Sequence, residues 1–516
     1  MNLAVVARYL GIVLFILGGA MLLSVPWAFP AAGEAQELEA AGLRGLGGAM
    51  LLAFLGGGLL FSLGARTQAS MLRKEALAVV GLSWIGATLL GAVPYILSGS
   101  RGTDTEVREW HQIAVDAIFE SASGFTGTGS TIFPNLENAS VLPRCILFWR
   151  QETHFLGSLG IMVLFVAILG HGAPGRRLMR TEMTGPIKDV PHTRIQHTAW
   201  AFSGIYVGLN ALLTSLFIVQ GMSLYDALCH SFATVATGGF STYNASLAHF
   251  NHIGIEITAT VFMVLACTNF MLLFWLLRGY FRPLLTDVEW LTYLGILAAS
   301  TGLIMTYGLD LEFFDSFGSA LRYASFQVVS IQTNTGLATA DFDRWDAFSK
   351  ALLLVLMFIG GCSGSTSCAI KVIRYCLMVK LLRHDLQRRI QSNVVRKVRL
   401  GGAPLDVDAL ERTVPLYFAA IGFIAVVGWL GLMATEPDIN WIEAGRPVSE
   451  KPIDCVSAVA ATINGVGPGL GLVGPTQTFA PMTSFGKLIL TALMLLGRLE
   501  LYAILVLFVP SFWQHR

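Results

Sequence analysis

The chain has 516 residues, of which 54% are hydrophobic and only 13% are charged, and its mean hydropathy is +0.64. Soluble domains carry about 25% charged residues, so this composition excludes a soluble globular protein and indicates an integral membrane protein. The formal net charge of +1 gives no support for a nucleic-acid partner. The seven cysteines form no CxxC pair, and we interpret them as apolar packing residues, not as disulfides or metal ligands.

The chain opens with an N-terminal segment, 1–70, that holds two apolar stretches at 3–27 and 45–63. The first stretch is long enough to cross a bilayer and lacks an obvious small-residue cleavage site. We therefore predict two transmembrane helices here and no removed signal peptide.

Four similar units are predicted to follow, at 71–175, 190–282, 283–400 and 401–516. Each unit consists of a spanning helix, a short helix that runs into a glycine-containing loop, and a second spanning helix. The predicted spans are 75–97 and 145–169, 198–219 and 253–277, 288–307 and 350–382, and 413–433 and 485–508. A loop can re-enter the bilayer only where protein buries it or where it lines a wet cavity. The predicted fold is therefore all-α, with ten spanning helices and four pseudo-symmetric loops around a central pore.

A repeated spacing marks the four loops. Counting thirteen residues back from Gly129, Gly239 and Gly467 reaches an aspartate each time, whereas Gly336 has Tyr323 at that offset. The three aspartates are Asp116, Asp226 and Asp454. An aspartate at a helix start can cap free N–H groups, and we expect that role here. Glycine beyond the helix lets carbonyl oxygens turn toward an axis, where four such segments can replace the water around a cation. Chance recurrence of glycine turns is the alternative, and four copies in matching context argue against it.

Basic residues between the units predict the orientation of the chain. They place both termini in the cytoplasm and make the glycine loops enter from outside, and the acidic connections at Asp104, Glu106, Glu109, Glu436, Asp438 and Glu443 agree. The basic residues are Arg66, Arg73, Lys74, Arg176, Arg177, Arg180, Lys188, Arg194, Arg278, Arg282, Arg383, Arg388, Arg389, Arg396, Lys397 and Arg399.

Five segments together resemble the TrkH branch of the Trk/Ktr/HKT superfamily of potassium-uptake proteins. They are SGFTGTGS, ATGGFST, TNTGLATADF, NGVGPGLG and GGCSGSTSCAIK. The resemblance covers nearly the whole chain and implies passive K⁺ entry through a selectivity filter that binds the ion by backbone carbonyls. It implies that the filter consists of Thr128 and Gly129, Gly238 and Gly239, Thr335 and Gly336, and Val466 and Gly467. Relatives that conduct sodium well often have serine at the first filter position, so Gly129 favours potassium.

The small residues of GGCSGSTS, 360–367, are expected to interrupt the second helix of the third unit. The resemblance makes this segment an intramembrane gate below the filter and adds an arginine of the last helix as an electrostatic barrier. The gate residues are then Gly360, Gly361, Ser363, Gly364, Ser365 and Arg498. Cys368 and Ala369 stand where the family usually has a second glycine pair, which predicts a stiffer loop or altered gating. The alternative for 360–367 is a close helix contact through small residues.

Several polar residues within predicted spans have structural alternatives. Arg498 can form a salt bridge with Glu500 or Glu152, or snorkel, instead of lining a pore. We interpret Arg150, Glu152 and His154 as a satisfied polar cluster. Asn269 is expected to make an interhelical hydrogen bond.

Two other functions remain as alternatives. A symporter that couples K⁺ entry to H⁺ or Na⁺ requires ionisable residues near mid-membrane, and the filter loops contain none. An intramembrane serine protease is suggested by GxSG at 361–364, but the downstream histidines, His384 and His515, are expected in cytoplasmic segments, and His154 would be an unusual base. No motif indicates ATP hydrolysis or dinucleotide binding, so we predict no enzyme activity and no organic cofactor.

The resemblance also implies partners. They are a second copy of the chain and a TrkA-like nucleotide-binding regulatory subunit, for which the basic cytoplasmic linkers are suited. The location that it implies is the inner membrane of a bacterium.

Overall fold

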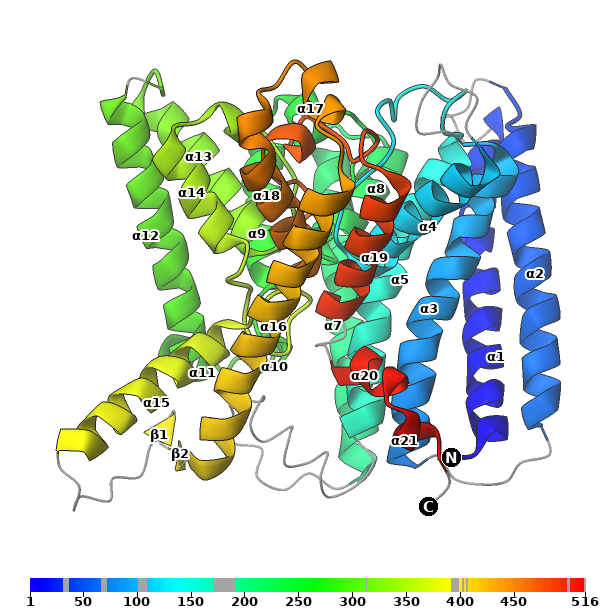
Figure 1. Cartoon of the computed structure of the whole chain (residues 1–516), viewed down its shortest axis with the longest axis horizontal. Coiled ribbons are helices and arrows are strands. Elements are labelled where there is room, and N and C mark those ends of the chain that lie inside the picture. The colour runs from blue at the N-terminus through cyan, green and yellow to red at the C-terminus, as the bar shows by residue number, and fades with distance from the viewer. Residues whose placement is uncertain are drawn as a thin grey trace.

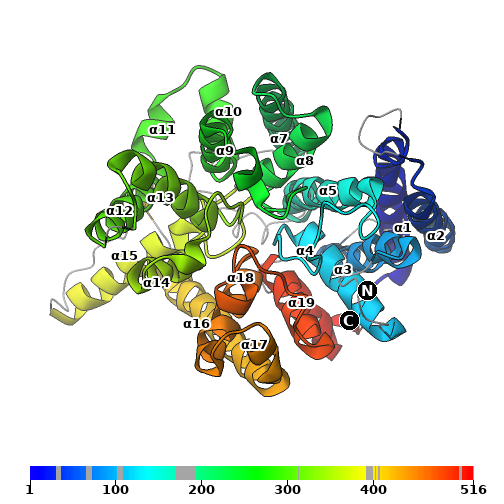
Figure 2. The same cartoon turned by 90° about the horizontal axis from the view of Figure 1, so that it is seen from above.

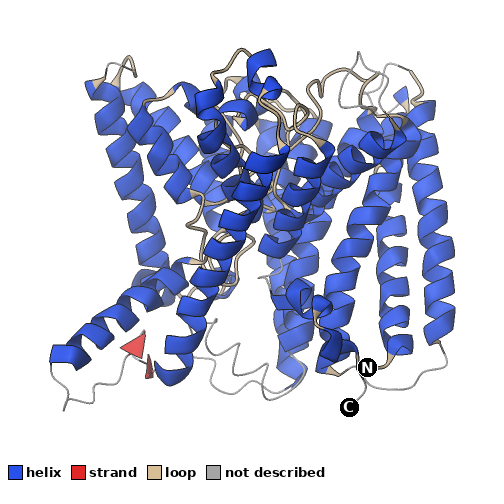
Figure 3. Ribbon diagram, viewed as in Figure 1, coloured by secondary structure: helices blue, strands red, loops and turns tan. Residues whose placement is uncertain are grey.

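The computed structural model describes residues 1–30, 37–65, 72–100, 109–169, 192–311, 313–390, 399–400, 403–404, 407–498 and 502–514. Regular structure in these residues is almost wholly helical, which confirms the predicted all-α class (Figure 3). The exception is a two-residue antiparallel pair between β1 (Arg399–Leu400) and β2 (Ala403–Pro404).

The N-terminal helices α1 (Leu3–Ala20) and α2 (Ala40–Gly64) pack side by side at one end of the molecule (Figures 1 and 2). Two short 3₁₀ turns, η1 (Met21–Leu23) and η2 (Val25–Ala28), follow α1. The contact is close because its residues are small: a Cβ on Gly11 would stand 2.7 Å from the Gly57 carbonyl oxygen. Small residues that let helix backbones approach are typical of packing inside a membrane.

The other helices form four groups in chain order. Each group has a long helix, a short inner helix and a second long helix, which is divided in two of the groups. The first group is α3 (Arg73–Ser98), α4 (Trp110–Thr126) and α5 (Arg144–Leu169). The second is α7 (His192–Val219), α8 (Leu224–Val235), α9 (Ile253–Ala266), α10 (Phe270–Leu277) and α11 (Arg282–Thr286). The third is α12 (Val288–Asp310), α13 (Phe317–Gln332), α14 (Ala347–Leu356) and α15 (Val372–Ile390). The last is α16 (Val407–Thr435), α17 (Ile439–Glu443), α18 (Lys451–Ile463) and α19 (Ser484–Arg498).

Six of the described helices are long and apolar enough to cross a membrane, and the bent pair of α9 and α10 makes seven. The other three predicted spans correspond to α5, to α14 with α15, and to α19 with α20 (Tyr502–Leu505). α5 contains Arg150 and Glu152, and a loop separates α14 from α15. The prediction of an unbroken helix over 253–277 is wrong, because α9 and α10 meet at an angle of 106°.

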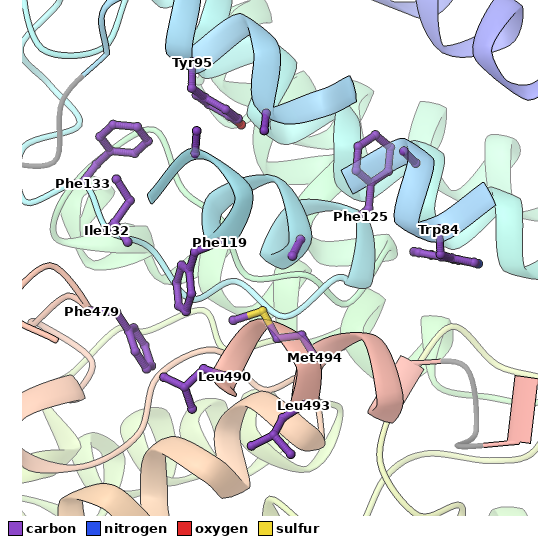
Figure 4. Close-up of a cluster of buried hydrophobic side chains, with 14 of the residues drawn as sticks. Trp84, Tyr95, Phe119, Phe125, Ile132, Phe133, Phe479, Leu490, Leu493 and Met494 are labelled. Atoms are coloured by element: carbon purple, nitrogen blue, oxygen red, sulfur yellow. The ribbon is translucent and has the colours of Figure 1, made fainter. Parts of the chain in front are cut away.

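The four short inner helices α4, α8, α13 and α18 surround the centre of the molecule when it is seen from above (Figure 2). They are largely buried between the long helices. Figure 4 shows the apolar packing of α4, where Phe119 lies beside Phe479 and above Leu490, Leu493 and Met494. The Phe119 and Phe479 ring centroids are 5.4 Å apart. This packing holds the end of α4 in a fixed place next to the centre.

Several elements lie along the face of the molecule at which α1 begins, the lower face in Figure 1. They include α11, α15, β1, β2 and α21 (Pro510–Trp513), which follows η8 (Val506–Phe508) (Figure 1). Met1, Val79 and Phe512 belong to one buried cluster and so bring both ends of the described chain together. The short turns η4 (Ser246–Phe250), η5 (Phe342–Arg344), η6 (Val448–Glu450) and η7 (Gly471–Val473) belong to the loop segments.

Candidate ion-conduction site

Each short inner helix ends in the same way. The N–H of the residue before the filter glycine bonds to the carbonyl oxygen five residues back, at 2.8 to 2.9 Å in all four groups. The four bonds are Thr128 to Ser123, Gly238 to Ala233, Thr335 to Ser330, and Val466 to Ala461. A second bond, i to i−3, accompanies each one, so all four ends are Schellman-type caps. The backbone therefore leaves all four inner helices in the same conformation.

Beyond these caps the backbone alternates in handedness. The filter glycines Gly129, Gly239, Gly336 and Gly467 have φ of 84°, 78°, 75° and 99°. The residues two positions earlier, Gly127, Thr237, Asn334 and Gly465, are also left-handed, with φ between 54° and 66°, whereas the residues between are not. Alternation of this kind turns successive carbonyl groups toward the same side of the strand. Only glycine adopts the later position without strain.

The four strands close on one another in a ring. A Cβ on Gly467 would stand 2.7 Å from the Thr128 carbonyl oxygen. A Cβ on any of the other three filter glycines would clash with the carbonyl oxygen of the residue before the next filter glycine. Gly129 meets Gly238 in this way, Gly239 meets Thr335, and Gly336 meets Val466. The structure thus brings all eight predicted filter residues together, and glycine is required for space as well as for backbone conformation.

The field at the ring favours a cation. The carboxyl ends of α4, α8, α13 and α18 lead into the ring, and the carboxyl end of a helix carries partial negative charge. None of the eight ring residues has an ionisable side chain. The ring therefore offers uncharged oxygens and helix dipoles to an ion, and no side chain of the ring carries a charge.

The three repeated aspartates do not cap helices, so that prediction is wrong. The residue before α8 is Ser223, whose side chain accepts the cap bond. The aspartates instead bind neighbouring segments. Asp116 pairs with the buried Lys487 at 2.6 Å, Asp226 accepts from the Thr242 hydroxyl at 2.7 Å, and Asp454 accepts from the indole N–H of Trp441 at 2.8 Å. These contacts fasten the inner helices to their surroundings.

An intramembrane loop, residues 357–371, lies between α14 and α15 and contains the predicted interruption. It is fastened to the break between α9 and α10: Cys362 N–H donates to the Cys267 carbonyl at 2.9 Å and Phe270 N–H to the Gly364 carbonyl at 3.2 Å. The Ser367 hydroxyl bonds to Asn334 Oδ1 at 3.0 Å, one residue before the filter pair of the third group. The loop therefore lies directly against the filter strands.

The other predicted gate residues fix the shape of this loop. Gly360 N–H donates to Ile370 at 3.0 Å, Gly361 N–H to the Ser367 hydroxyl at 2.8 Å, and Ser363 N–H to Glu289 on α12 at 2.7 Å. Gly364 is left-handed, and the Ser365 hydroxyl donates to the Cys362 carbonyl at 2.6 Å.

Arg498, at the end of α19, is 7% exposed, and its Nη1 lies 3.6 Å from the place where a Cβ on Gly127 of the first filter loop would stand. Its Nη1 donates to the Thr366 carbonyl at 3.1 Å and approaches Cys368 Sγ at 2.7 Å, and its Nη2 donates to the Ser158 hydroxyl at 2.8 Å. Glu152 does not pair with it, because that carboxylate accepts from Ser24 at 2.8 Å. Glu500, the other predicted partner, lies outside the described residues. The guanidinium therefore connects the intramembrane loop to α5 without an acidic partner in the described chain.

The two residues that depart from the family pattern are both in contact with this site. A Cβ on Gly465 would stand 2.8 Å from Cys368 Sγ, so the thiol lies against the fourth filter strand. Ala369 has φ of +47°, a conformation that favours glycine.

Two other interpretations from the sequence need correction. Among the residues that the structure describes, the Asn269 side chain makes no interhelical hydrogen bond. It caps α10, with its Oδ1 accepting from Met271 N–H at 2.9 Å. The interpretation of Arg150, Glu152 and His154 as one polar cluster is only partly correct. Arg150 and His154 both bind α4 and residues 240–241, whereas the Glu152 carboxylate accepts from the Ser24 hydroxyl. Of the predicted basic residues, Arg66, Arg176, Arg177, Arg180, Lys188, Arg396 and Lys397 lie outside the described residues, as do Asp104, Glu106 and His515.

The family model TrkH, described as a cation transport protein, matches residues 48–515. This chain is a member of that family. It is 35% identical over 524 residues to the Trk system potassium uptake protein TrkH of Salmonella typhimurium, with 100% of both chains covered. It is 30% identical to the Trk system potassium uptake protein TrkG of Escherichia coli, with 86% of each covered. The crystal structure of the potassium transporter TrkH from Vibrio parahaemolyticus superposes with a TM-score of 0.83 at 31% identity, covering 100% of both chains.

Sequence reasoning missed the buried contacts that hold the filter strands from behind. Glu120, His230, Gln327 and Ser457 lie nine or ten residues before a filter glycine. Glu120 binds Arg150 at 2.5 Å and accepts from Ile132 N–H at 2.9 Å. His230 Nε2 lies 3.0 Å from the Ser241 hydroxyl. Ser457 accepts from Leu470 N–H at 2.8 Å. The shared offset from the glycines could have indicated them, but the residue types differ in every copy.

Proposed function

We propose that this chain takes up potassium through a channel-like pore whose filter is the ring of four loops. The observation that carries the proposal is the closed ring, in which each filter glycine abuts the carbonyl of the residue before the next filter glycine. Backbone carbonyls held in a ring can replace the hydration shell of K⁺. Curated relatives over the full length of the chain are named potassium uptake proteins, and the K⁺ ion is the transported substrate.

The intramembrane loop and Arg498 form the proposed gate. The loop contacts the third filter strand through Ser367 and Asn334, and the Arg498 guanidinium fastens the loop from below. A fixed positive charge on the pathway of a cation is an electrostatic barrier. Conduction then requires the loop and the guanidinium to move away from the axis.

Several parts of the proposal rest on family membership together with the chain's charges. They are an inner-membrane location with both termini in the cytoplasm, a homodimer, and control by a TrkA-like nucleotide-binding subunit. The start of α1 and α21 lie near each other on the lower face in Figure 1, and Met1 and Phe512 belong to one buried cluster, which supports a common side for the termini. The proposal includes no enzyme activity. Both ring nitrogens of His154 are engaged by Gly124 and Phe240, so this histidine offers no base to Ser363.

The test is uptake of radioactive Rb⁺ into K⁺-loaded proteoliposomes that contain the full chain. Unlabelled K⁺ outside should suppress uptake, and the same concentration of Na⁺ should not. If the chain alone shows no flux, the assay is repeated with the regulatory subunit added. Equal suppression by Na⁺ and K⁺ would contradict the potassium-selective pore, and a requirement for a proton gradient would favour symport.

A further inference from the structure

The second filter strand differs from the others at the position before its filter glycine. Thr128, Thr335 and Val466 occupy that position in the other strands, but the second strand has Gly238. In the first and third strands the threonine hydroxyl bonds to the threonine two residues earlier, at 2.8 Å in both cases. In the fourth, the Val466 side chain is fully buried. The second strand has no side chain to hold it in this way.

The imidazole of His154 occupies the space that the missing side chain leaves. His154 lies on α5 of the first group and is fully buried. A Cβ on Gly238 would stand 2.5 Å from both Cγ and Cδ2 of the imidazole. Gly238 has no positive φ, so its backbone conformation does not require glycine. The requirement comes from the histidine.

The two ring nitrogens of His154 bind backbone atoms of two different helix groups, the first and the second. Phe240 N–H, just after the filter of the second strand, donates to Nε2 at 3.3 Å. Because Nε2 is the acceptor, Nδ1 carries the proton and donates to the Gly124 carbonyl on α4 at 2.7 Å. The imidazole also stacks on the Phe240 ring, with centroids 4.2 Å apart. One neutral side chain thus connects the first inner helix to the second filter strand.

Arg150, one turn earlier on α5, holds the same strand further along. Its guanidinium lies 3.3 Å from the centroid of the Phe240 ring and donates to the Ser241 carbonyl at 3.1 Å. It also pairs with the fully buried Glu120 of α4 at 2.5 Å. Glu120 in turn accepts from the Thr131 hydroxyl at 2.9 Å. The first and second strands are therefore tied to each other through α5.

We propose that His154 is a positioning residue for the Gly238 carbonyl, replacing from another helix the side chain that the second filter strand lacks. This inference rests on the proposed potassium filter. The ion touches the carbonyl and not the imidazole, so His154 acts through the strand. Loss of the imidazole leaves a cavity behind one of the four carbonyls of the ring, and the ring then adapts its size to smaller ions.

The experiment measures Rb⁺ uptake by full-length protein in proteoliposomes, with K⁺ or Na⁺ as competitor. His154→Ala should conduct but lose about fivefold in preference for K⁺ over Na⁺, the factor that corresponds to about one hydrogen bond. The double variant His154→Ala with Gly238→Val copies the fourth strand, where Val466 fills this position, and should recover most of the preference. Gly238→Val alone should lose preference or flux, because valine and imidazole cannot occupy the same space. Replacement of the exposed His249 by alanine is the matched control and should change neither quantity.

The outcomes separate this inference from the proposed function. A wild-type protein without K⁺ preference would contradict the filter itself. A selective wild type with an equally selective His154→Ala variant would overturn only the positioning role, as would a double variant no better than the single one. If His154→Ala does not assemble, the double variant decides: recovery of a K⁺-selective protein supports the proposal, and failure to recover it overturns the proposal.

Discussion

Replacement of Arg498 by glutamine should raise K⁺ flux, because it removes the positive charge from below the filter. Nη1 of Arg498 lies 3.6 Å from the place where a Cβ on Gly127 would stand, so an ion that leaves the filter passes close to it. At about 6 Å and an effective dielectric constant of about 20, a unit positive charge raises the energy of K⁺ by about 3 kcal/mol. That energy corresponds to about a 100-fold effect on a rate. Screening by water and salt reduces this energy, so we expect a rise of between about tenfold and about 100-fold.

The assay is Rb⁺ uptake into proteoliposomes at equal amounts of reconstituted protein. Two variants separate charge from packing. Arg498→Lys keeps the charge and should stay near the wild-type rate, whereas Cys368→Ala keeps the charge but removes the thiol that Nη1 contacts at 2.7 Å. If Arg498→Gln conducts at the wild-type rate, the guanidinium is not a barrier. If Cys368→Ala matches the glutamine variant, loosening of the intramembrane loop accounts for the effect and the electrostatic reasoning fails.

Two further predictions concern residues that contact a filter glycine or the loop segment that follows it. The Ser130 hydroxyl donates to the Gly467 carbonyl at 2.9 Å, so Ser130→Ala should free this oxygen for the ion and lower the half-saturating K⁺ concentration about two- to fivefold; an unchanged or higher value contradicts this. At Asp343, burial opposes ionisation, but the Gly471 N–H and the Arg446 guanidinium outweigh it and hold the pKa below its ordinary value. The stability that this carboxylate contributes is therefore complete above about pH 4 and is lost as the pH falls through the lowered pKa. Melting temperatures of wild type and Asp343→Asn should differ at neutral pH and converge in acid, whereas a constant difference would rule out the linkage.

The four filter glycines could be predicted from the sequence because the requirement for them is local. The second left-handed residue after each capped helix end is glycine in every copy, whereas the first is Thr237 or Asn334 in two of them. The interruption at 360–367 was predictable for a similar reason, since small residues there disfavour a helix.

The contacts between groups were not predictable, because they join residues far apart in the chain that share no pattern. His154 and Gly238 are 84 positions apart, and only their packing explains why the second strand has two consecutive glycines. The break between α9 and α10 likewise has no glycine or proline to indicate it. The intramembrane loop fills the space that this break opens, and its backbone groups bond to the Ala266 and Cys267 carbonyls. Tertiary bonds therefore override an apolar sequence that would otherwise continue as a helix.

We propose that Gly129 is one of four glycines whose neighbouring carbonyls select K⁺. The most direct test is competition of external K⁺ and Na⁺ with Rb⁺ uptake, compared between wild type and Gly129→Ser. Serine at this position would have to adopt a φ of +84°, and its Cβ would clash with the Gly238 carbonyl oxygen. We predict that wild-type uptake is suppressed by K⁺ and not by Na⁺, and that the variant conducts with a weaker distinction between the two. A Gly129→Ser protein that conducts with unchanged K⁺ preference would contradict the four-loop filter.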